Sequence, residues 1–159
     1  MTQSPSSATP MRKRPPKAVY NVLNPLFVAI LRSPLHRVLS KRLLALSFTG
    51  RKSGKRYVIP VAYGQTGSTL LITTQSGWSK NMRGGAQVEV RLQGQARQGH
   101  AELFTDEQGL WEGFRTMLRL TPELSNIVGV GVDGDGNPQR EDVARARQQG
   151  FVLVQIQLN

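Results

Sequence analysis

The sequence predicts an antiparallel β-barrel with added helices. Short apolar segments with the pattern of β-strands follow one another from residue 43 to residue 103, separated by turn residues as in hairpins. One more apolar segment ends the chain, and the helical patterns lie toward the ends of this strand-rich part. At 159 residues the chain is long enough for one domain with a proper core. Strands in hairpin order with helices at the ends favour a single barrel.

The beginning of the chain is predicted to differ from the rest. Residues 1–17 are rich in Ser, Pro, Lys and Arg, which predicts a disordered basic tail before one domain at 18–159. No apolar run reaches the ~18 residues that a membrane-spanning helix needs. The chain has no cysteine, which excludes disulfides and thiolate sites and fits a reducing cytoplasm.

Two dipeptides predict short helices before the strands. Asn24-Pro25 and Ser33-Pro34 each resemble an N-cap followed by proline at the first helical position. They predict helices near 25–31 and 34–40. The second is basic and amphipathic, a pattern that usually packs on its own domain but can also lie on anionic lipid. Peripheral membrane contact therefore stays open.

Six strands are expected, and one of them contains a proline. Proline cannot donate to a β-ladder, so Pro60 marks an edge, a bulge or an opening of the sheet. Gly64–Gly67 is a hairpin signal. The expected strands are 43–48, 56–63, 69–74, 87–92, 95–103 and 151–158.

The helical patterns of the second half are shorter and depend on capping residues. Thr105 and Gln108 have the spacing of a capping box, which predicts a helix that runs to about Leu120. Further helical segments are expected at 78–82, after Thr121-Pro122, and at 140–149.

A basic, glycine-containing turn is the most informative motif. Thr49–Arg56 carries four cations, two glycines and two hydroxyls between two strands. Glycine accepts positive φ, and successive N–H groups in such a turn can form an anion-binding concavity. Arg and Lys add charge-assisted hydrogen bonds. The turn predicts a phosphate or polyanion clamp, and its bland alternative is a solvated basic hairpin.

The charges of the chain are divided between its halves. Residues 1–88 contain 14 Lys and Arg and no acidic residue, whereas residues 89–159 contain 7 Lys and Arg and 10 Asp and Glu. The first half therefore carries a charge of +14 and the second half a charge of −3, which together give the net charge of +11. This asymmetry indicates an anionic partner, such as a phosphorylated cofactor, a membrane surface or nucleic acid. A solubilising charge excess without a partner is the alternative.

Three other patterns in the sequence do not support a nucleotide-binding or metal-binding site. Only three residues separate Gly50 from Gly54 where a nucleotide P-loop has four, so a P-loop is rejected. The run 133–137 resembles the start of an EF-hand loop, but Pro138 and Ala144 stand where Gly and Glu are required, and Asx turns are the better interpretation. His36 and His100 have no visible ligand cluster, so no metal is expected. His36 is expected to be a surface or helix residue, and His100, in a predicted strand, is expected to be structural.

Several segments together resemble the deazaflavin (coenzyme F-420)-dependent nitroreductase and quinone-reductase family, within the split β-barrel flavin-binding superfamily. The resemblance covers roughly residues 24–103. It rests on Ser33–Ser40, Leu43–Phe48 leading into Thr49-Gly-Arg-Lys-Ser-Gly54, Arg56 through Ile59-Pro60-Val61, Leu70–Thr74, Trp78 with Asn81-Met82, and Val88-Glu-Val90.

The resemblance implies a fold and a cofactor. The fold is a six-stranded antiparallel split β-barrel, similar to FMN-binding split barrels, with flanking helices. The cofactor is coenzyme F-420, whose tail carries a phosphodiester and several glutamates and so suits the basic half. The implied cofactor-binding residues are Thr49, Gly50, Arg51, Lys52, Ser53, Gly54, Arg56, Pro60, Val61, Ala62, Thr73, Thr74, Gln75, Ser76, Gly77, Trp78 and Asn81.

The implied activity is hydride transfer from the reduced deazaflavin to a quinone or a similar electrophilic acceptor. The cofactor performs the chemistry, so no catalytic side chain is expected. A split barrel that binds FMN or haem is the alternative within the fold, and a non-catalytic basic module on anionic membrane or nucleic acid is the alternative outside it. Nucleic acid is not expected, because the basic residues lack interleaved aromatic residues. A homodimer and a cytoplasmic, potentially membrane-associated location complete the expectations.

Overall fold

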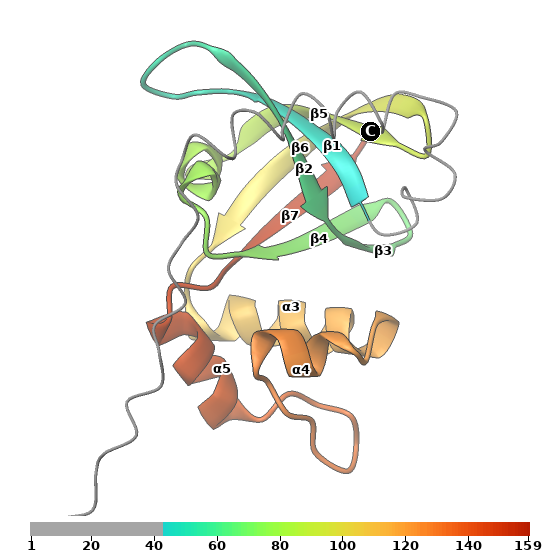
Figure 1. Ribbon diagram of the computed structural model, residues 1–159, viewed down its shortest axis with the longest axis vertical. Coiled ribbons are helices and arrows are strands. Elements are labelled where there is room, and N and C mark those ends of the chain that lie inside the picture. The colour runs from blue at the N-terminus through green and yellow to red at the C-terminus, as the bar shows by residue number, and fades with distance from the viewer. Residues whose placement is uncertain (1–42) are drawn as a thin grey trace, which may run out of the picture.

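The computed structural model describes residues 43–159, and the helices expected near 25–31 and 34–40 lie outside this part. Strands alternate with short connections in its first half, and helices α3 to α5 follow before the last strand (Figure 1). The elements in chain order are β1 (Leu43–Thr49), β2 (Arg56–Ala62), β3 (Gly64–Thr66), β4 (Thr69–Thr74), the 3-10 helix η1 (Gly77–Met82), β5 (Ala86–Leu92), β6 (Gln95–Phe104), α3 (Glu107–Leu120), α4 (Leu124–Val128), α5 (Arg140–Gln148) and β7 (Val152–Leu158).

All the strands belong to one antiparallel sheet with the order β2-β1-β5-β6-β7-β4-β3. The sheet curves into a half-barrel, so that β2 and β4 approach each other across its concave side (Figure 1). β2 is one edge of the sheet, and Pro60 lies in it opposite Ala45 of β1. Of the three alternatives predicted for Pro60, an edge, a bulge or an opening of the sheet, the structure shows the edge.

The concave side of the sheet encloses the main core. Alternate residues of a strand point to opposite faces. In β4, Leu70 and Ile72 join the core inside the sheet, whereas Leu71 joins a second core beneath the helices. Leu44 and Leu46 of β1 are also fully buried in the first core. Strands from opposite ends of the sheet thus share one interior, as a barrel requires.

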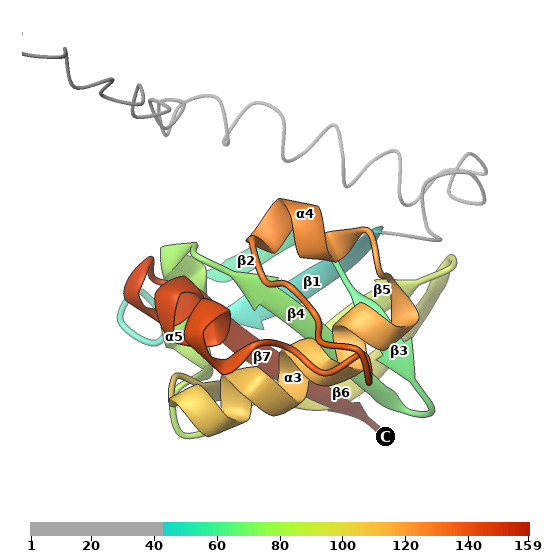
Figure 2. The same ribbon diagram turned by 90° about the horizontal axis from the view of Figure 1, so that it is seen from below.

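The helices form a separate layer on the outer face of the sheet (Figures 1 and 2). Phe114 and Met117 of α3 pack there with Leu153 of β7 and Val143 of α5. Gly113 allows the close approach of α3 to β7, because a Cβ at this position would collide with the side chain of Leu153. This two-layer arrangement leaves the β1–β2 turn and η1 clear of the helices (Figure 1).

The predicted fold class is confirmed, with one correction to the strand count. The described sheet has seven strands rather than six, because the hairpin signal at 64–67 forms the short strand β3 against β4. β2 ends at Ala62, one residue before the predicted end. The remaining five strands lie where they were expected, within one residue at each end.

The capping of α3 and α4 differs from the prediction. Asp106, not Thr105, is the N-cap of α3, and its Oδ2 accepts a hydrogen bond from the amide of Gly109 at 2.9 Å. Aspartate is as good an N-cap as threonine, and the helix therefore begins one position later than predicted. α4 begins at Leu124 after Glu123, which makes no side-chain cap, rather than directly after Thr121-Pro122.

The loop between α4 and α5 confirms the Asx-turn interpretation. Oδ1 of Asp133 accepts hydrogen bonds from the amides of Asp135 and Asn137, both at 2.9 Å. Within residues 43–159, no three His, Asp or Glu side chains gather as a metal ion would require. None of the helices in the same part is long and apolar enough to cross a membrane.

Candidate functional site

A cleft of about 810 Å³ lies between the β1–β2 turn and η1. One wall is the basic turn that follows β1, and the other is the 3-10 helix that follows β4. The two segments lie about 30 positions apart in the sequence and are brought together by the curvature of the sheet. The lining residues are Phe48, Gly50, Arg51, Lys52, Ser53, Tyr57, Gly77, Trp78, Lys80, Asn81 and Arg83.

The backbone of the turn is held by its own hydrogen bonds. The amide of Gly50 donates to the carbonyl of Lys55 at 2.8 Å, and the amide of Gly54 donates to the carbonyl of Gly50 at 2.9 Å. Gly54 has φ +66°, a conformation that glycine adopts without strain. The amide of Lys55 donates to Oγ of Ser53 at 3.2 Å. Glycine and serine therefore close the turn into a fixed shape.

Two amides at the tip of the turn remain available. In the described part of the chain, the amides of Lys52 and Ser53 make no hydrogen bond, whereas those of Gly50, Arg51, Gly54 and Lys55 do. The predicted anion-binding concavity thus reduces to two adjacent N–H groups. Both belong to residues that line the cleft.

Asn81 joins the two walls of the cleft. Its Oδ1 accepts a hydrogen bond from the amide of Arg51 at 3.0 Å, and its Nδ2 donates to the carbonyl of Trp78 at 2.8 Å. The first bond crosses from η1 to the turn, and the second lies within η1. Both ends of the side-chain amide are therefore engaged inside the protein.

Three aromatic rings form a continuous apolar surface along the cleft. Phe48 stacks on Tyr57 with ring centroids 5.6 Å apart and contacts Trp78 at 6.0 Å. Phe48 is buried, while Tyr57 is 42% exposed and offers a ring to a ligand. The Tyr57 hydroxyl also lies 3.2 Å from Oγ of Ser53, which ties the ring to the turn. A planar ligand could stack here beside a charged one.

The charge of the cleft is entirely positive. Within the described residues, four cations line it, Arg51, Lys52, Lys80 and Arg83, and no Asp, Glu or His does. None of the four forms an ion pair with a carboxylate of residues 43–159. Exposed, unpaired cations of one sign in a concave surface attract anions.

The structure brings only part of the predicted site together. Of the predicted residues, Gly50, Arg51, Lys52, Ser53, Gly77, Trp78 and Asn81 line the cleft. Arg56 instead pairs with Glu89 of β5 at 3.1 Å. Thr49 and Gly54 belong to the same turn without lining the cleft. Pro60, Val61 and Ala62 lie farther along β2, and Thr73 to Ser76 lie at the end of β4 and in the loop before η1.

Four lining residues were not among the predicted site residues. Phe48 and Tyr57 are direct partners in the β1–β2 ladder, so hairpin pairing around the turn would have placed the two rings together. Lys80 and Arg83 flank Asn81 in the sequence. The predicted helical turn at 78–82 could have indicated them, because a helical turn places several of its side chains on one surface.

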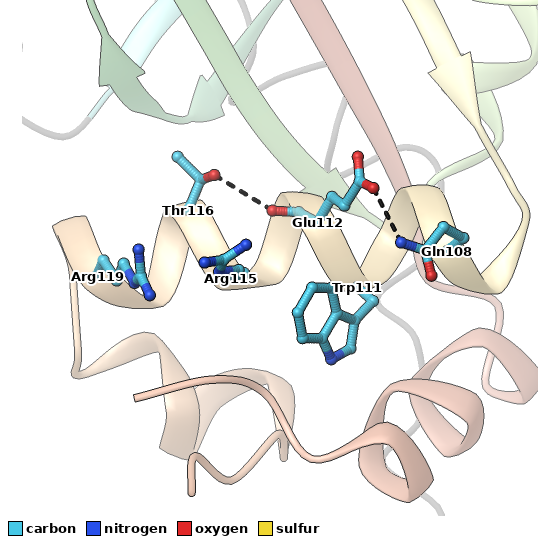
Figure 3. Close-up of a pocket in the computed structure, with 6 residues that line it drawn as sticks. All are labelled: Gln108, Trp111, Glu112, Arg115, Thr116 and Arg119. Carbon is cyan, nitrogen blue, oxygen red and sulfur yellow. Dashed lines mark hydrogen bonds between the residues drawn. The ribbon is translucent and has the colours of Figure 1, made fainter. Parts of the chain in front are cut away.

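A second, smaller cavity of about 520 Å³ lies along the exposed face of α3 (Figure 3). Trp111 donates from Nε1 to the carbonyl of Pro138 at 2.9 Å, and Arg115 and Arg140 lie 5.5 and 4.5 Å from its ring centroid. Glu112 accepts a hydrogen bond from Gln108 across this face (Figure 3). These contacts serve the packing of α3 against α5 and the loop before it, and the face lacks the exposed backbone amides of the first cleft.

Three comparisons with known proteins place this architecture in context. The family model described as F420H(2)-dependent quinone reductase matches residues 33–123. No curated protein matches the chain.

Solved structures resemble the chain at low identity. A putative pyridoxamine 5′-phosphate oxidase from Listeria innocua is 16% identical, with 81% of this chain and 94% of that one covered and a TM-score of 0.48. A FAD-binding protein from Mesorhizobium loti is 19% identical, with 79% and 85% covered and a TM-score of 0.48. An FAD and heme binding protein from Mycobacterium smegmatis is 15% identical, with 80% and 67% covered and a TM-score of 0.46.

The family match spans more than half of the chain and includes the turn, the aromatic residues and η1 that form the cleft. The chain therefore belongs to the F420H(2)-dependent quinone reductase family and is an oxidoreductase that uses the deazaflavin coenzyme F-420.

Proposed function

We propose that the cleft between the β1–β2 turn and η1 binds coenzyme F-420, and that the enzyme reduces a quinone or a similar electrophilic acceptor. The observation that carries this proposal is the set of four unpaired cations around two free amides. A coenzyme with a phosphodiester and several carboxylates needs such a surface.

The donor set of the cleft fits this coenzyme in charge and in shape. Guanidinium and ammonium groups bind phosphate and carboxylate oxygens with charge-assisted hydrogen bonds. The free amides of Lys52 and Ser53 add backbone donors of the kind that hold phosphates in turns. The stacked rings of Tyr57 and Phe48, with Trp78 tilted beside them, provide a surface for a planar ring system. The cleft volume lies in the range of ligand sites.

The residues of the cleft bind and orient rather than exchange protons. When bound in its reduced form, the deazaflavin supplies the hydride. Arg51 and Lys52 would hold its anionic tail, and Lys80 and Arg83 extend the positive surface along η1. Among residues 43–159, no carboxylate or imidazole lines the cleft, and the acceptor would take its proton from water. Positioning alone can lower a barrier by several kcal/mol.

The remaining predicted contacts extend the site along the sheet. Pro60, Val61 and Ala62 would line the deazaflavin ring through their backbone, and Thr73 to Ser76 would close the other side. These contacts remain predictions. Variants at Val61 and Thr74 that change ring binding without changing tail binding would support them.

The test is a fluorescence titration with F-420 and FMN in parallel. We expect F-420 to bind more tightly than FMN, and Arg51→Ala to raise its Kd by about tenfold, as for the loss of one charge-assisted contact. Lys52→Glu should have a larger effect, since it reverses a charge. Arg119→Ala is the matched control, because it removes an exposed cation from the second cavity.

The outcomes separate the alternatives. If both turn variants bind F-420 like the wild type, the cleft does not hold the tail. If only Arg119→Ala weakens binding, the coenzyme occupies the cavity on α3. If FMN binds and F-420 does not, the cofactor assignment fails while the basic cleft remains a phosphate site.

A further inference from the structure

Among residues 43–159, Asn81 is the one residue whose side chain makes hydrogen bonds to both walls of the cleft. The amide of Arg51 reaches it from the turn, and the carbonyl of Trp78 accepts from it within η1. The turn also has its own internal hydrogen bonds, but these fix its shape and not its place relative to η1. The Arg51–Asn81 bond, 30 positions apart in sequence, supplies that second constraint.

We propose that Asn81 is a positioning residue that places the basic turn against η1. The inference rests on the proposed function of the cleft and gives the predicted site residue Asn81 a role that acts through the turn. A primary amide has one carbonyl and one NH₂ group, and each makes one hydrogen bond to a backbone partner, the carbonyl across the cleft and the NH₂ within η1. These two bonds fix the orientation of the side chain between the two walls.

The position of Arg51 in the chain explains how its hydrogen bond to Asn81 can influence the anion-binding amides. Arg51 directly precedes Lys52 and Ser53, whose amides are free. Fixing the amide of Arg51 therefore restricts where the next two peptide groups can lie, although each residue keeps its own φ and ψ. A turn that is ordered before binding loses less conformational entropy when the anion arrives. The residue thus contributes to affinity by preorganising its neighbours.

The other contacts of the turn and of η1 do not fix the position of one wall relative to the other by a hydrogen bond. On the turn, Tyr57 is linked to Ser53 at 3.2 Å, but both belong to the β1–β2 hairpin and move with it. On η1, Ser79 bonds to the carbonyl of Ser76 and so holds only its own helix. Phe48 contacts Trp78 through rings, a contact without a fixed hydrogen-bond direction. In the part of the chain that the structure describes, the directional link between the two walls is the hydrogen bond of Asn81 to the amide of Arg51.

The first test measures the link in the apoprotein by amide hydrogen exchange of Arg51. Asn81→Ala removes the acceptor, and we expect exchange at Arg51 to become about tenfold faster or more. Asn81→Asp keeps an oxygen in the same place, so exchange should stay close to that of the wild type. Asn126→Ala, an exposed asparagine of α4, is the control and should change nothing. Equal exchange in Asn81→Ala and the wild type would overturn the proposal.

The second test asks whether Asn81 acts through the turn, with F-420 as the titrant. We expect Asn81→Ala to raise the Kd by about tenfold, but by less than about threefold when Lys52→Ala is already present, because residues that act through one another are not additive. Equal effects in both backgrounds would show a direct contact and would refute the positioning role. If the wild type does not bind F-420, the proposed function fails, while amide exchange still decides whether Asn81 holds the turn.

Discussion

Gly54 shows how a single backbone conformation supports the basic turn. Its φ of +66° lies in the left-handed region, and a Cβ added there would meet no other atom within 4 Å. The cost of a side chain at this position is therefore conformational strain alone. Gly134 has equally open space around it and no positive φ, which makes it a matched control.

We predict that Gly54→Ala lowers the free energy of unfolding by about 1–2 kcal/mol, the cost of placing a non-glycine residue in the left-handed region. Gly134→Ala should be neutral or stabilise by up to about 1 kcal/mol, since it reduces the entropy of the unfolded chain. Urea unfolding of both variants measures the difference. Similar values for the two would mean that the turn does not depend on this conformation.

Tyr63 connects stability to pH at the other end of β2. Burial raises the pKa of its hydroxyl above the usual 10, and a hydrogen bond with Gln93 lowers it by a smaller amount. The folded state therefore favours the protonated phenol more than the unfolded state does. The stabilisation is fully present below pH 10 and is lost as the pH rises through the raised pKa of the folded protein.

Tyr63→Phe should therefore reduce the loss of stability above pH 10, because phenylalanine does not ionise. The measurement is the midpoint of urea unfolding for both proteins at pH 8 and at several values above 10. The difference between the two pH profiles isolates the contribution of Tyr63. Parallel profiles would refute the assignment.

At the scale of elements, α3 depends on glycine for its contact with the sheet. Gly113 is buried, and an added Cβ would lie 2.9 Å from Cδ1 of Leu153 and closer still to Cδ2. Glycine has a low helix propensity, so its presence inside α3 is explained by this close approach to β7. Helix propensity and packing here have opposite preferences.

We predict that Gly113→Ala lowers the free energy of unfolding by about 1–3 kcal/mol despite the better helix propensity of alanine, because overpacking forces a shift of α3. Leu153→Val in the same chain should recover part of the loss by removing a methylene where the new methyl must fit. Thermal unfolding of the two single variants and the double variant tests this coupling. Strict additivity would place the clash elsewhere.

The elements also show what sequence patterns could and could not predict. The strand at 69–74 was predicted correctly from its short apolar run after a hairpin signal. The run does not alternate, because Leu70 and Ile72 face one core and Leu71 faces the other. The predicted N-cap of α3 was wrong by one position. Thr105 and Asp106 are both good capping residues, and only the fold decides between them. β3 was missed as a strand because its three residues pair with β4 and carry no apolar pattern of their own.

The same limit applies to the site. Local composition was enough to find the basic turn, because glycines and cations are adjacent in the sequence. The link between Arg51 and Asn81 depends on how the sheet curves, and no local pattern reports a contact across 30 positions. Likewise, Arg56 looked like part of the clamp until the pairing of β1 with β2 and β5 placed it beside Glu89.

At the scale of the whole molecule, the separation of charge along the chain becomes a separation in space. The cleft collects cations only from the first half of the sequence, Arg51, Lys52, Lys80 and Arg83. The helical layer, built from the second half, carries most of the acidic residues of the chain. The molecule therefore presents a positive surface to an anionic ligand without neutralising it from the other side.

This arrangement predicts a salt-dependent affinity for the coenzyme. Several exposed charges act on one polyanionic ligand, and salt screens such interactions beyond about 10 Å at 0.1 M. We expect the Kd of F-420 to rise by about tenfold between low and high salt, and that of FMN, with a single phosphate, to rise less. Arg83→Gln should flatten the F-420 curve, whereas Arg119→Gln on α3 should leave its slope unchanged. Fluorescence titrations across a salt series measure all four slopes. A Kd for F-420 that does not change with salt would mean that the cations of the cleft do not hold the tail, whatever their proximity to the turn.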